Sequence, residues 1–379
     1  MYPVFIYRTG ARMAETKIHE VFYGLLRFSV GESDDFSMTL SEEEWNGVFE
    51  MALQQTLLGL LFFGIEKHGR LNIPRELLMK WYGVSEQIRR MNMRCNKAAV
   101  EVQRLFAEQG VASCILKGQG NTLNYPSPYV RMCGDVDVWV DGGVRDVLAL
   151  VRRWVPEARC DCHHVEFKEV DGVEVEVHFL PAFTNNMIRS RRMQRWFEQQ
   201  AKEQYEHVVT LPDGVGDISV PTPAFNRIFQ MAHISHHLFY EGIGLRQILD
   251  YYFVLKQGFS EEERRRDEAL LKEFGLYELT GAVMYVLQVV LQMKEEELLV
   301  APDVRRGRFV LQELMLSGNF GQYDERGGQG RSWMERNVKR LMRDVRMLRY
   351  FPAECLWEPV FRMYHFLWRG WYNRGVRRK

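Results

Sequence analysis

The strongest constraint on the fold is a period-two pattern in the middle of the chain. Residues 134–141 read GDVDVWVD, so carboxylates alternate with apolar side chains. Successive side chains of a β-strand leave opposite faces, so Asp135 and Asp137 share one face while Val136 and Val138 share the other. The segment therefore predicts a strand with one buried apolar face and two neighbouring carboxylates on the opposite face.

Further strand patterns lie on both sides of this segment. Residues 111–118, VASCILKG, are a short apolar run that ends at a glycine, which is typical of a buried strand. HHVEFKEV (163–170) and VEVEVHF (173–179) flank the pair Asp171-Gly172. This pair supplies the positive φ angles of a type I′ turn, so the two runs predict a β-hairpin.

Helical patterns fill the rest of the chain. Residues 41–69 begin with a serine cap and acidic residues and end at a glycine, which predicts one helix, and residues 74–110 predict another. Residues 145–158 predict an amphipathic helix ended by a proline. Thr222 can cap a further helix with a proline at its first position.

These patterns predict an α+β protein in three parts. We expect an N-terminal helical region (1–84), a compact core with a small mixed sheet (85–220) and a C-terminal helical domain (221–379). A chain of 379 residues is long enough for two or three domains.

Composition excludes several classes of protein. The 50 basic and 50 acidic residues give zero formal charge, so no global field attracts nucleic acid or an anionic membrane. No apolar stretch is long enough to span a bilayer, and the apolar run near the N-terminus is too short for a signal peptide. The six cysteines show no secreted-type framework. We expect a soluble cytoplasmic protein with reduced thiols that binds neither membrane nor nucleic acid.

The paired carboxylates point to a metal. Asp135 and Asp137 would repel each other unless a cation lies between them, and Mg²⁺ favours a pair of carboxylates with phosphate oxygens. A third carboxylate would allow two ions to act on a phosphoryl group. Glu174, Glu176 and His178 share one face of their predicted strand, so spacing alone leaves both glutamates open as the third acid.

Glycines precede the carboxylates at a position that suits phosphate. Gly118 and Gly120 follow the first strand pattern, where backbone N–H groups at the entry to a short helix can face a phosphate. Lys117 and Arg131 are available to balance the charge of that phosphate. The segment is not a Walker loop, because no Gly-Lys-Ser/Thr follows.

The order of these motifs resembles the bacterial uncharacterised nucleotidyltransferase family, part of the superfamily that shares the fold of DNA polymerase beta. The resemblance covers roughly residues 90 to 260. The matching residues are Leu116-Lys117-Gly118, Tyr125-Pro126, Arg131, Asp135-Val136-Asp137, Glu176-Val177-His178, His236 or His237, Leu245, Arg246 and Asp250.

The resemblance implies Mg²⁺-dependent transfer of a nucleoside monophosphate, with AMP from ATP the expected case, to a hydroxyl of a small molecule or protein, with release of pyrophosphate. It implies that Asp135, Asp137 and Glu176 hold two Mg²⁺ ions. The implied nucleotide-binding residues are Lys117, Gly118, Gly120 and Arg131, and the implied substrate-side residues are His178, His236, His237, Arg246 and Asp250.

Two alternatives remain open from the sequence. One is a nucleotide-binding adaptor with a degenerate site, and the other is a helical scaffold whose Asp-x-Asp is a solvated strand face. The base of the nucleotide, the acceptor and the oligomeric state are also left open.

Other motifs favour structural interpretations. In CDCHH (160–164) successive strand residues would point to opposite faces, so we expect no zinc site there. HISHH (233–237) lacks the glutamate of zinc peptidases, and we expect its histidines to line a domain interface. Asp250 lies one turn from Arg246, its expected partner. We expect the aromatic face of the tail, residues 355–379, to pack on the domain beneath.

Overall fold

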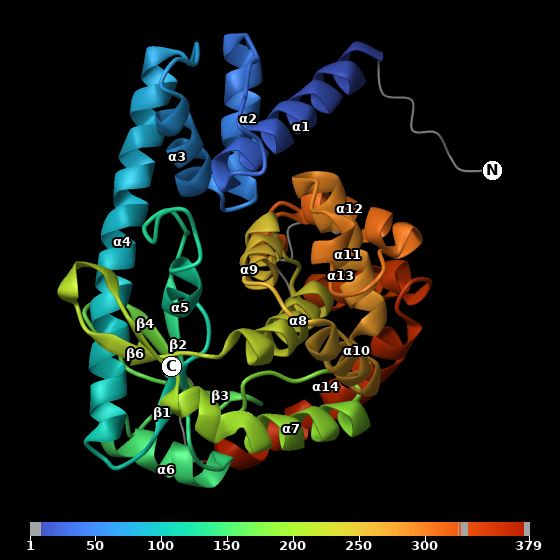
Figure 1. Ribbon diagram of the computed structural model, residues 1–379. Coiled ribbons are helices and arrows are strands. Elements are labelled where there is room, and N and C mark those ends of the chain that lie inside the picture. The colour runs from blue at the N-terminus through green and yellow to red at the C-terminus, as the bar shows by residue number, and fades with distance from the viewer. Residues whose placement is uncertain (1–8, 325, 327–332, 375–379) are drawn as a thin grey trace.

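The computed structural model describes residues 9–324, 326 and 333–374. Its N-terminal part is helical (Figure 1). The helices before the sheet are α1 (Thr9–Val30), α2 (Glu42–Gln54), α3 (Leu58–His68) and α4 (Arg75–Ala107). The α4 helix runs along the whole height of one side of the molecule, and its C-terminal half lies against the sheet (Figure 1).

A small mixed sheet follows, in the strand order β1-β2-β4-β3. The strands are β1 (Ser113–Ile115), β2 (Asp135–Val140), β3 (His164–Glu166) and β4 (Glu174–His178). The β2–β4 pair is parallel, and β1 and β3 are the antiparallel edges. A short helix α5 (Gln119–Thr122) lies between β1 and β2, and α6 (Val144–Trp154) follows β2. The predicted α+β class with a small mixed sheet is confirmed.

The two faces of the sheet differ as the alternation predicts. Val136 and Val138 of β2, with Val175 and Val177 of β4, are at most 3% exposed and pack in one apolar core with α4 and α6. The carboxylates occupy the opposite face. On that face Trp139 packs into the larger core of the helical half, whereas Asp135 and Glu176 line a cavity.

The β3–β4 hairpin has the predicted turn. Asp171 and Gly172 have φ angles of 53° and 70°, as a type I′ turn requires. Val170 and Val173 exchange both backbone hydrogen bonds across it, at 2.9 and 3.0 Å. The turn fixes the hairpin, and the parallel pairing of β4 with β2 then places β4 beside Asp135 and Asp137.

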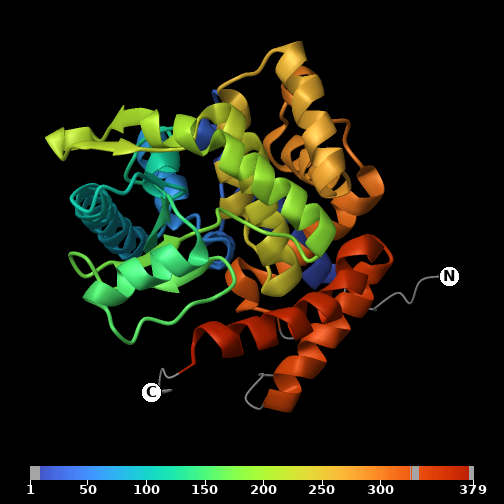
Figure 2. The same cartoon turned by 90° about the horizontal axis from the view of Figure 1, so that it is seen from below.

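The C-terminal half is helical and forms a second, larger core with α1–α3. Its elements are α7 (Met187–Glu206), the hairpin β5 (Val208–Thr210) and β6 (Asp217–Ser219), α8 (Pro223–Tyr240), α9 (Leu245–Lys256), α10 (Glu261–Phe274), α11 (Tyr277–Leu291), α12 (Val304–Ser317), α13 (Trp333–Leu348) and α14 (Pro352–Tyr372). The predicted cap is present, because the Phe225 N–H donates to the Thr222 hydroxyl. Seen from below, α14 extends from the helical half back toward the sheet (Figure 2).

Side-chain hydrogen bonds fix the end of α14 to the sheet half, among them one from Arg152 to the Tyr372 carbonyl at 3.2 Å. The Asn373 amide donates to the Cys160 carbonyl and accepts from the Cys160 N–H, both at 2.8 Å. The helix therefore closes over the polar face of the sheet.

One predicted helix is in fact two. Residues 41–69 break between Gln54 and Leu58, and Thr56 has a φ of 55°. Tertiary contacts account for the break, because the buried Gln55 amide donates to the Leu314 carbonyl and its oxygen accepts from the Leu245 N–H. Local caps could not reveal contacts with residues so distant in sequence.

The proposed boundary after residue 84 falls inside α4, which is unbroken from Arg75 to Ala107. Trp81 packs in the larger core, whereas Phe106 packs beneath the sheet. The helix therefore joins the first two proposed parts, and the three-part division remains a prediction.

Candidate active site

A cavity of about 1530 Å³ lies between the polar face of the sheet and helices α8 and α14. The sheet side contributes residues from the end of β1, from β2 and from the β3–β4 hairpin. Among the lining residues are Lys117, Asp135, His163, His164, Glu176, His178, His233, His236, His237, Arg362, Met363 and Phe366.

The register of two strands sets the positions of the acids. Parallel pairing places Asp137 opposite Glu176 and Asp135 opposite Glu174. One carboxylate oxygen each of Asp137 and Glu176 and a ring nitrogen of His178 lie within 4.8 Å of one another. Glu176 lines the cavity, whereas Glu174 is exposed and is not among the described residues that line it. The geometry therefore favours Glu176 over Glu174 as the third acid.

Asp137 is held between two nitrogen groups. The Lys117 Nζ lies 3.1 Å from its Oδ2, and the His178 Nε2 lies 2.9 Å from its Oδ1. The same His178 nitrogen is 3.4 Å from Glu176 Oε2. The Asp137 side chain is only 1% exposed, so its charge needs these partners.

The pKa values of this group follow from burial and charge together. Burial alone would raise the pKa of Asp137, but the charges of Lys117 and His178 outweigh it and hold that pKa below its usual value. Burial is likewise outweighed at Glu176, whose pKa falls to about 2, chiefly through the hydrogen bond from His178. The pKa of His178 rises to about 9, because its bonds to the two acids outweigh its burial.

Asp135 belongs to the same electrostatic group. Burial would lower the pKa of Lys117, but the nearby charges of Asp137, Asp135 and Glu176 outweigh burial and raise it. The three acids therefore act on one lysine at the wall of the cavity.

The two glycines have different structural roles. Gly118 has a φ of 63° and a ψ of −108°, a conformation that strongly favours glycine, and it turns the chain from Lys117 into α5. A Cβ on Gly120 would lie 2.9 Å from the Val220 side chain, so close packing requires glycine there. Neither is among the described residues that line the cavity.

Arg131 is not one of the described residues that line the cavity. It is 6% exposed, and its guanidinium holds both oxygens of Asp250 in a bidentate pair, at 2.7 and 2.8 Å. The Tyr125 hydroxyl donates to the same carboxylate at 2.8 Å. The expected Asp250–Arg246 pair is therefore wrong, because Arg246 donates instead to the Met132 carbonyl. Tertiary packing, rather than helical spacing, chose the partner of Asp250.

The histidines of α8, His233, His236 and His237, line the cavity. The cavity lies between the sheet and the helices, where the sequence predicted a domain interface. The His236 ring packs 4.5 Å from the Phe183 ring and 5.7 Å from the His163 ring, between centroids. Burial holds the pKa of His236 well below its usual value. The His237 Nδ1 lies 3.3 Å from a Glu241 oxygen. His178, His236 and His237 thus share one cavity, whereas Arg246 and Asp250 lie elsewhere.

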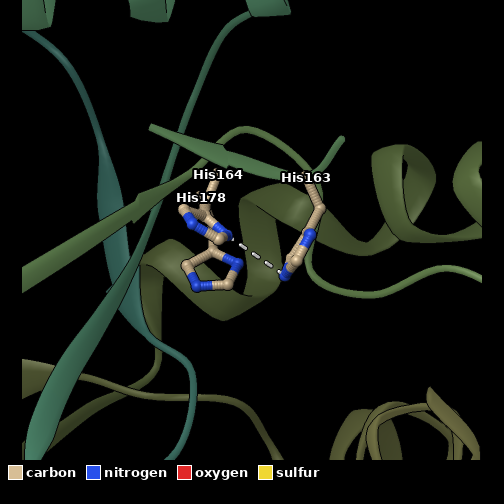
Figure 3. A group of neighbouring side chains, drawn as sticks. All are labelled: His163, His164 and His178. Atoms are coloured by element: carbon tan, nitrogen blue, oxygen red, sulfur yellow. Dashed lines mark hydrogen bonds between the residues drawn. The ribbon is translucent and has the colours of Figure 1, made fainter. Parts of the chain in front are cut away.

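The structure also adds residues that the sequence patterns did not assign. His163 and His164 lie together, with His163 Nε2 3.3 Å from His164 Nδ1, although CDCHH was expected to point to opposite faces (Figure 3). The reason is that β3 begins at His164, so His163 lies outside the strand alternation. The His-His pair of CDCHH was the sequence signal for these two cavity residues.

The far wall of the cavity comes from α13 and α14. Arg340, Arg362, Met363 and Phe366 line it. The tail was expected to pack its aromatic face on the domain beneath, and Phe361 (5% exposed) and Trp368 do pack there, whereas Phe366 is 72% exposed. Its interleaved aromatic and basic residues were the sequence signal for this wall.

Comparison with known proteins identifies the family. The model of a family described as "uncharacterised nucleotidyltransferase" matches residues 41–293, about two thirds of the chain. The chain belongs to this nucleotidyltransferase family. The match spans the acids, the lysine and the α8 histidines, whereas the wall from α13 and α14 lies beyond it.

This nucleotidyltransferase has also been compared with curated proteins and with solved structures. No curated protein matches the chain. A solved structure of an antigenic nucleotidyltransferase-like protein from Paracoccidioides brasiliensis is 14% identical, with a TM-score of 0.29, and the match covers 53% of this chain and 93% of that one. Among the helices that the structure describes, none has the length and apolar character needed to cross a membrane.

Proposed function

We propose that this nucleotidyltransferase uses Mg²⁺ to move a nucleoside monophosphate, AMP from ATP in the first case to test, to a hydroxyl of a small-molecule or protein acceptor, with release of pyrophosphate. The observation that carries the proposal is the pairing of Asp137 with Glu176 on neighbouring strands, beside Asp135 and Lys117 at one cavity wall.

The donor set fits Mg²⁺. Asp135 and Glu176 line the cavity, and Asp137 lies beside Glu176 on the same face. Mg²⁺ prefers carboxylates together with phosphate oxygens and water, and three carboxylates are enough for two ions. When bound, Mg²⁺ would neutralise charge on the phosphates and on the transferring phosphoryl group.

The protein groups have separate tasks in this proposal. Lys117, 19% exposed and 3.1 Å from Asp137, is placed to bind a phosphate beside the metal-holding acids. Glu176, whose pKa is about 2, stays ionised at neutral pH and suits cation binding better than proton abstraction. In this proposal the Gly118 backbone N–H donates to a phosphate. Gly120 packs against Val220, and Arg131 pairs with Asp250.

The acceptor would enter from the helical side. His236 and His237 of α8 and Arg362 of α14 line the cavity opposite the sheet. The cavity of about 1530 Å³ is large enough for a nucleotide and part of a second substrate.

Calorimetric titration with ATP tests the proposal. Wild type should bind ATP in an Mg²⁺-dependent manner, and the double change Asp135→Asn with Asp137→Asn should remove that dependence. Glu174→Gln is the matched control, because Glu174 is an exposed acid on the same strand face as Glu176. Binding that ignores both the metal and the double change would exclude the metal site, and with it the transferase.

One observation favours a second candidate, the nucleotide-binding adaptor. Both oxygens of Asp137 already face nitrogen partners, Lys117 and His178, so the group is charge-compensated by the protein itself. Incubation with α-labelled ATP and a cell extract separates the two. A transferase labels an acceptor and releases pyrophosphate, whereas an adaptor binds ATP and labels nothing.

The scaffold alternative has its own test. A chain without a ligand shows no stabilisation by ATP and Mg²⁺, whereas a binder gains stability by mass action. A thermal-shift series over ATP concentration distinguishes them.

A further inference from the structure

We propose that His163, His164 and His178 form a binding site for a zinc-class divalent transition metal, next to the carboxylate site but with ligands of its own. This goes beyond the proposed function, because it concerns a different metal and different ligands. His163 directly precedes β3, His164 begins it and His178 ends β4. Figure 3 shows the His163 ring facing the rings of the other two.

The distances suit a small tetrahedral ion. One ring nitrogen from each histidine lies within 4.8 Å of the other two. His163 Nε2 and His164 Nδ1 are 3.3 Å apart. Zinc–nitrogen bonds of about 2.0–2.1 Å at a tetrahedral angle place two ligand nitrogens roughly 3.3 Å apart. This pair therefore already has the spacing of two zinc ligands.

The third histidine has the hydrogen bonding of a metal ligand. His178 Nε2 bonds to Asp137 at 2.9 Å, and its Nδ1 is buried without a hydrogen-bond partner in the part of the chain that the structure describes. Metal-bound histidines commonly donate their second N–H to a carboxylate, which fixes the ring and increases its basicity. His178 thus has the carboxylate in place and leaves Nδ1 for an ion.

The ligand chemistry selects the metal. Imidazoles favour zinc and its neighbours, whereas Mg²⁺ and Ca²⁺ prefer oxygen. All three histidines line the cavity, so an ion can enter. Three protein ligands leave a fourth position for water or a substrate oxygen, which is the composition of catalytic zinc sites.

A rival group lies nearby and has to be separated experimentally. Asp161, Cys162 and His365 also place ligand atoms within 4.8 Å of one another. The histidine group is the stronger candidate, because it offers three imidazoles and the 3.3 Å nitrogen pair, whereas the His365 Nε2 of the rival group lies 2.5 Å from an Asp161 oxygen. His365→Ala is therefore the matched control.

The experiment titrates the chelator-treated, full-length chain with Co²⁺ and then Zn²⁺. Wild type should bind one equivalent of Co²⁺ with the intense visible absorption of a four-coordinate site, and Zn²⁺ should displace it. His163→Ala and His164→Gln should each weaken Zn²⁺ binding by at least about 10- to 100-fold. His365→Ala and Asp135→Asn should change it less than about threefold, because neither residue belongs to the ligands.

Circular dichroism on every variant shows whether it is folded. If His163→Ala fails to fold, the His164→Gln variant, whose side chain is only partly buried, decides the question. Zinc binding unchanged in His164→Gln, zinc binding lost in His365→Ala, or no stoichiometric binding by wild type would each overturn the proposal. Because Asp135→Asn removes a proposed Mg²⁺ ligand only, failure of the Mg²⁺ site and failure of the zinc site give different results.

Discussion

The pair of Arg131 and Asp250 offers a test that separates phosphate binding from structural support. Arg131 lies shortly before the strand that carries Asp135, and Asp250 lies on α9. Their bidentate pair therefore connects the sheet half of the molecule to the helical half. Replacing Arg131 with methionine keeps most of the side-chain volume and removes the charge.

The magnitude follows from burial. The side chains of Arg131 and Asp250 are 6% and 8% exposed, so Arg131→Met leaves a buried carboxylate with the Tyr125 hydroxyl as its remaining hydrogen-bond partner at 2.8 Å. Breaking a buried pair in this way costs about 3–5 kcal/mol of unfolding free energy. The nearby charge of Arg246 also lowers the pKa of Asp250, so we expect the lower end, about 3 kcal/mol. Adding Asp250→Asn removes the unpaired charge and should recover about 2 kcal/mol.

The assay is urea unfolding at pH 7, followed by tryptophan fluorescence and circular dichroism. Burial would raise the pKa of Asp250, but the pair with Arg131 outweighs it and lowers that pKa. The contribution of the pair to the unfolding free energy is therefore present above the pKa of Asp250 in the unfolded chain, about 4. It is lost as pH falls through the lower pKa of Asp250 in the folded chain. ATP titration of the folded variant should give a Kd within about threefold of wild type, because Arg131 is paired with Asp250 and is not among the described residues that line the cavity.

The opposite pattern would refute this account. If Arg131→Met left the unfolding free energy unchanged and weakened ATP binding more than about tenfold, the loss would match a charge-assisted bond to phosphate. Arg131 would then belong to the nucleotide site.

Two further predictions concern pH and backbone strain. Burial raises the pKa of Glu354 from 4.5 to about 7, so the folded chain retains a proton that the unfolded chain releases between these values. Wild-type stability should therefore fall by about 3 kcal/mol from pH 4.5 to 7 relative to Glu354→Gln in urea unfolding, and parallel pH curves would contradict this. Gly118→Ala should lose about 1–3 kcal/mol in the same assay, because its φ of 63° with ψ of −108° strains any other residue. Gly134→Ala, with open space around it and no positive φ, should change stability by less than about 0.5 kcal/mol, and equal effects at the two glycines would exclude the strain.

Much of the fold could be predicted because its signals are local. The alternation at Asp135 and Asp137, the turn at Asp171-Gly172 and the cap at Thr222 each depend on a few neighbouring residues. The break near Thr56 could not be predicted in this way, because it depends on contacts that Gln55 makes far along the chain.

Part of the candidate site likewise follows from local geometry, and part depends on tertiary structure. That Asp135 and Asp137 share a face follows from strand geometry, and so does the shared face of Glu174 and Glu176. Strand spacing left Glu174 and Glu176 open, and the family resemblance pointed to Glu176. The parallel register of β2 and β4 gives the physical reason, since it places Glu176 beside Asp137 at the cavity.

The sequence alone therefore determined most of the elements and their faces, because backbone geometry and side-chain alternation act over a few residues. Its motifs carried the resemblance to the family. Only the tertiary structure decided the partners. Arg131 and Asp250 are 119 residues apart, and His163 lies beside His178 because a strand begins one residue later than the pattern suggested. Charged and ring groups with similar local spacing pair according to distances that packing of distant segments sets, and burial then makes those pairs strong.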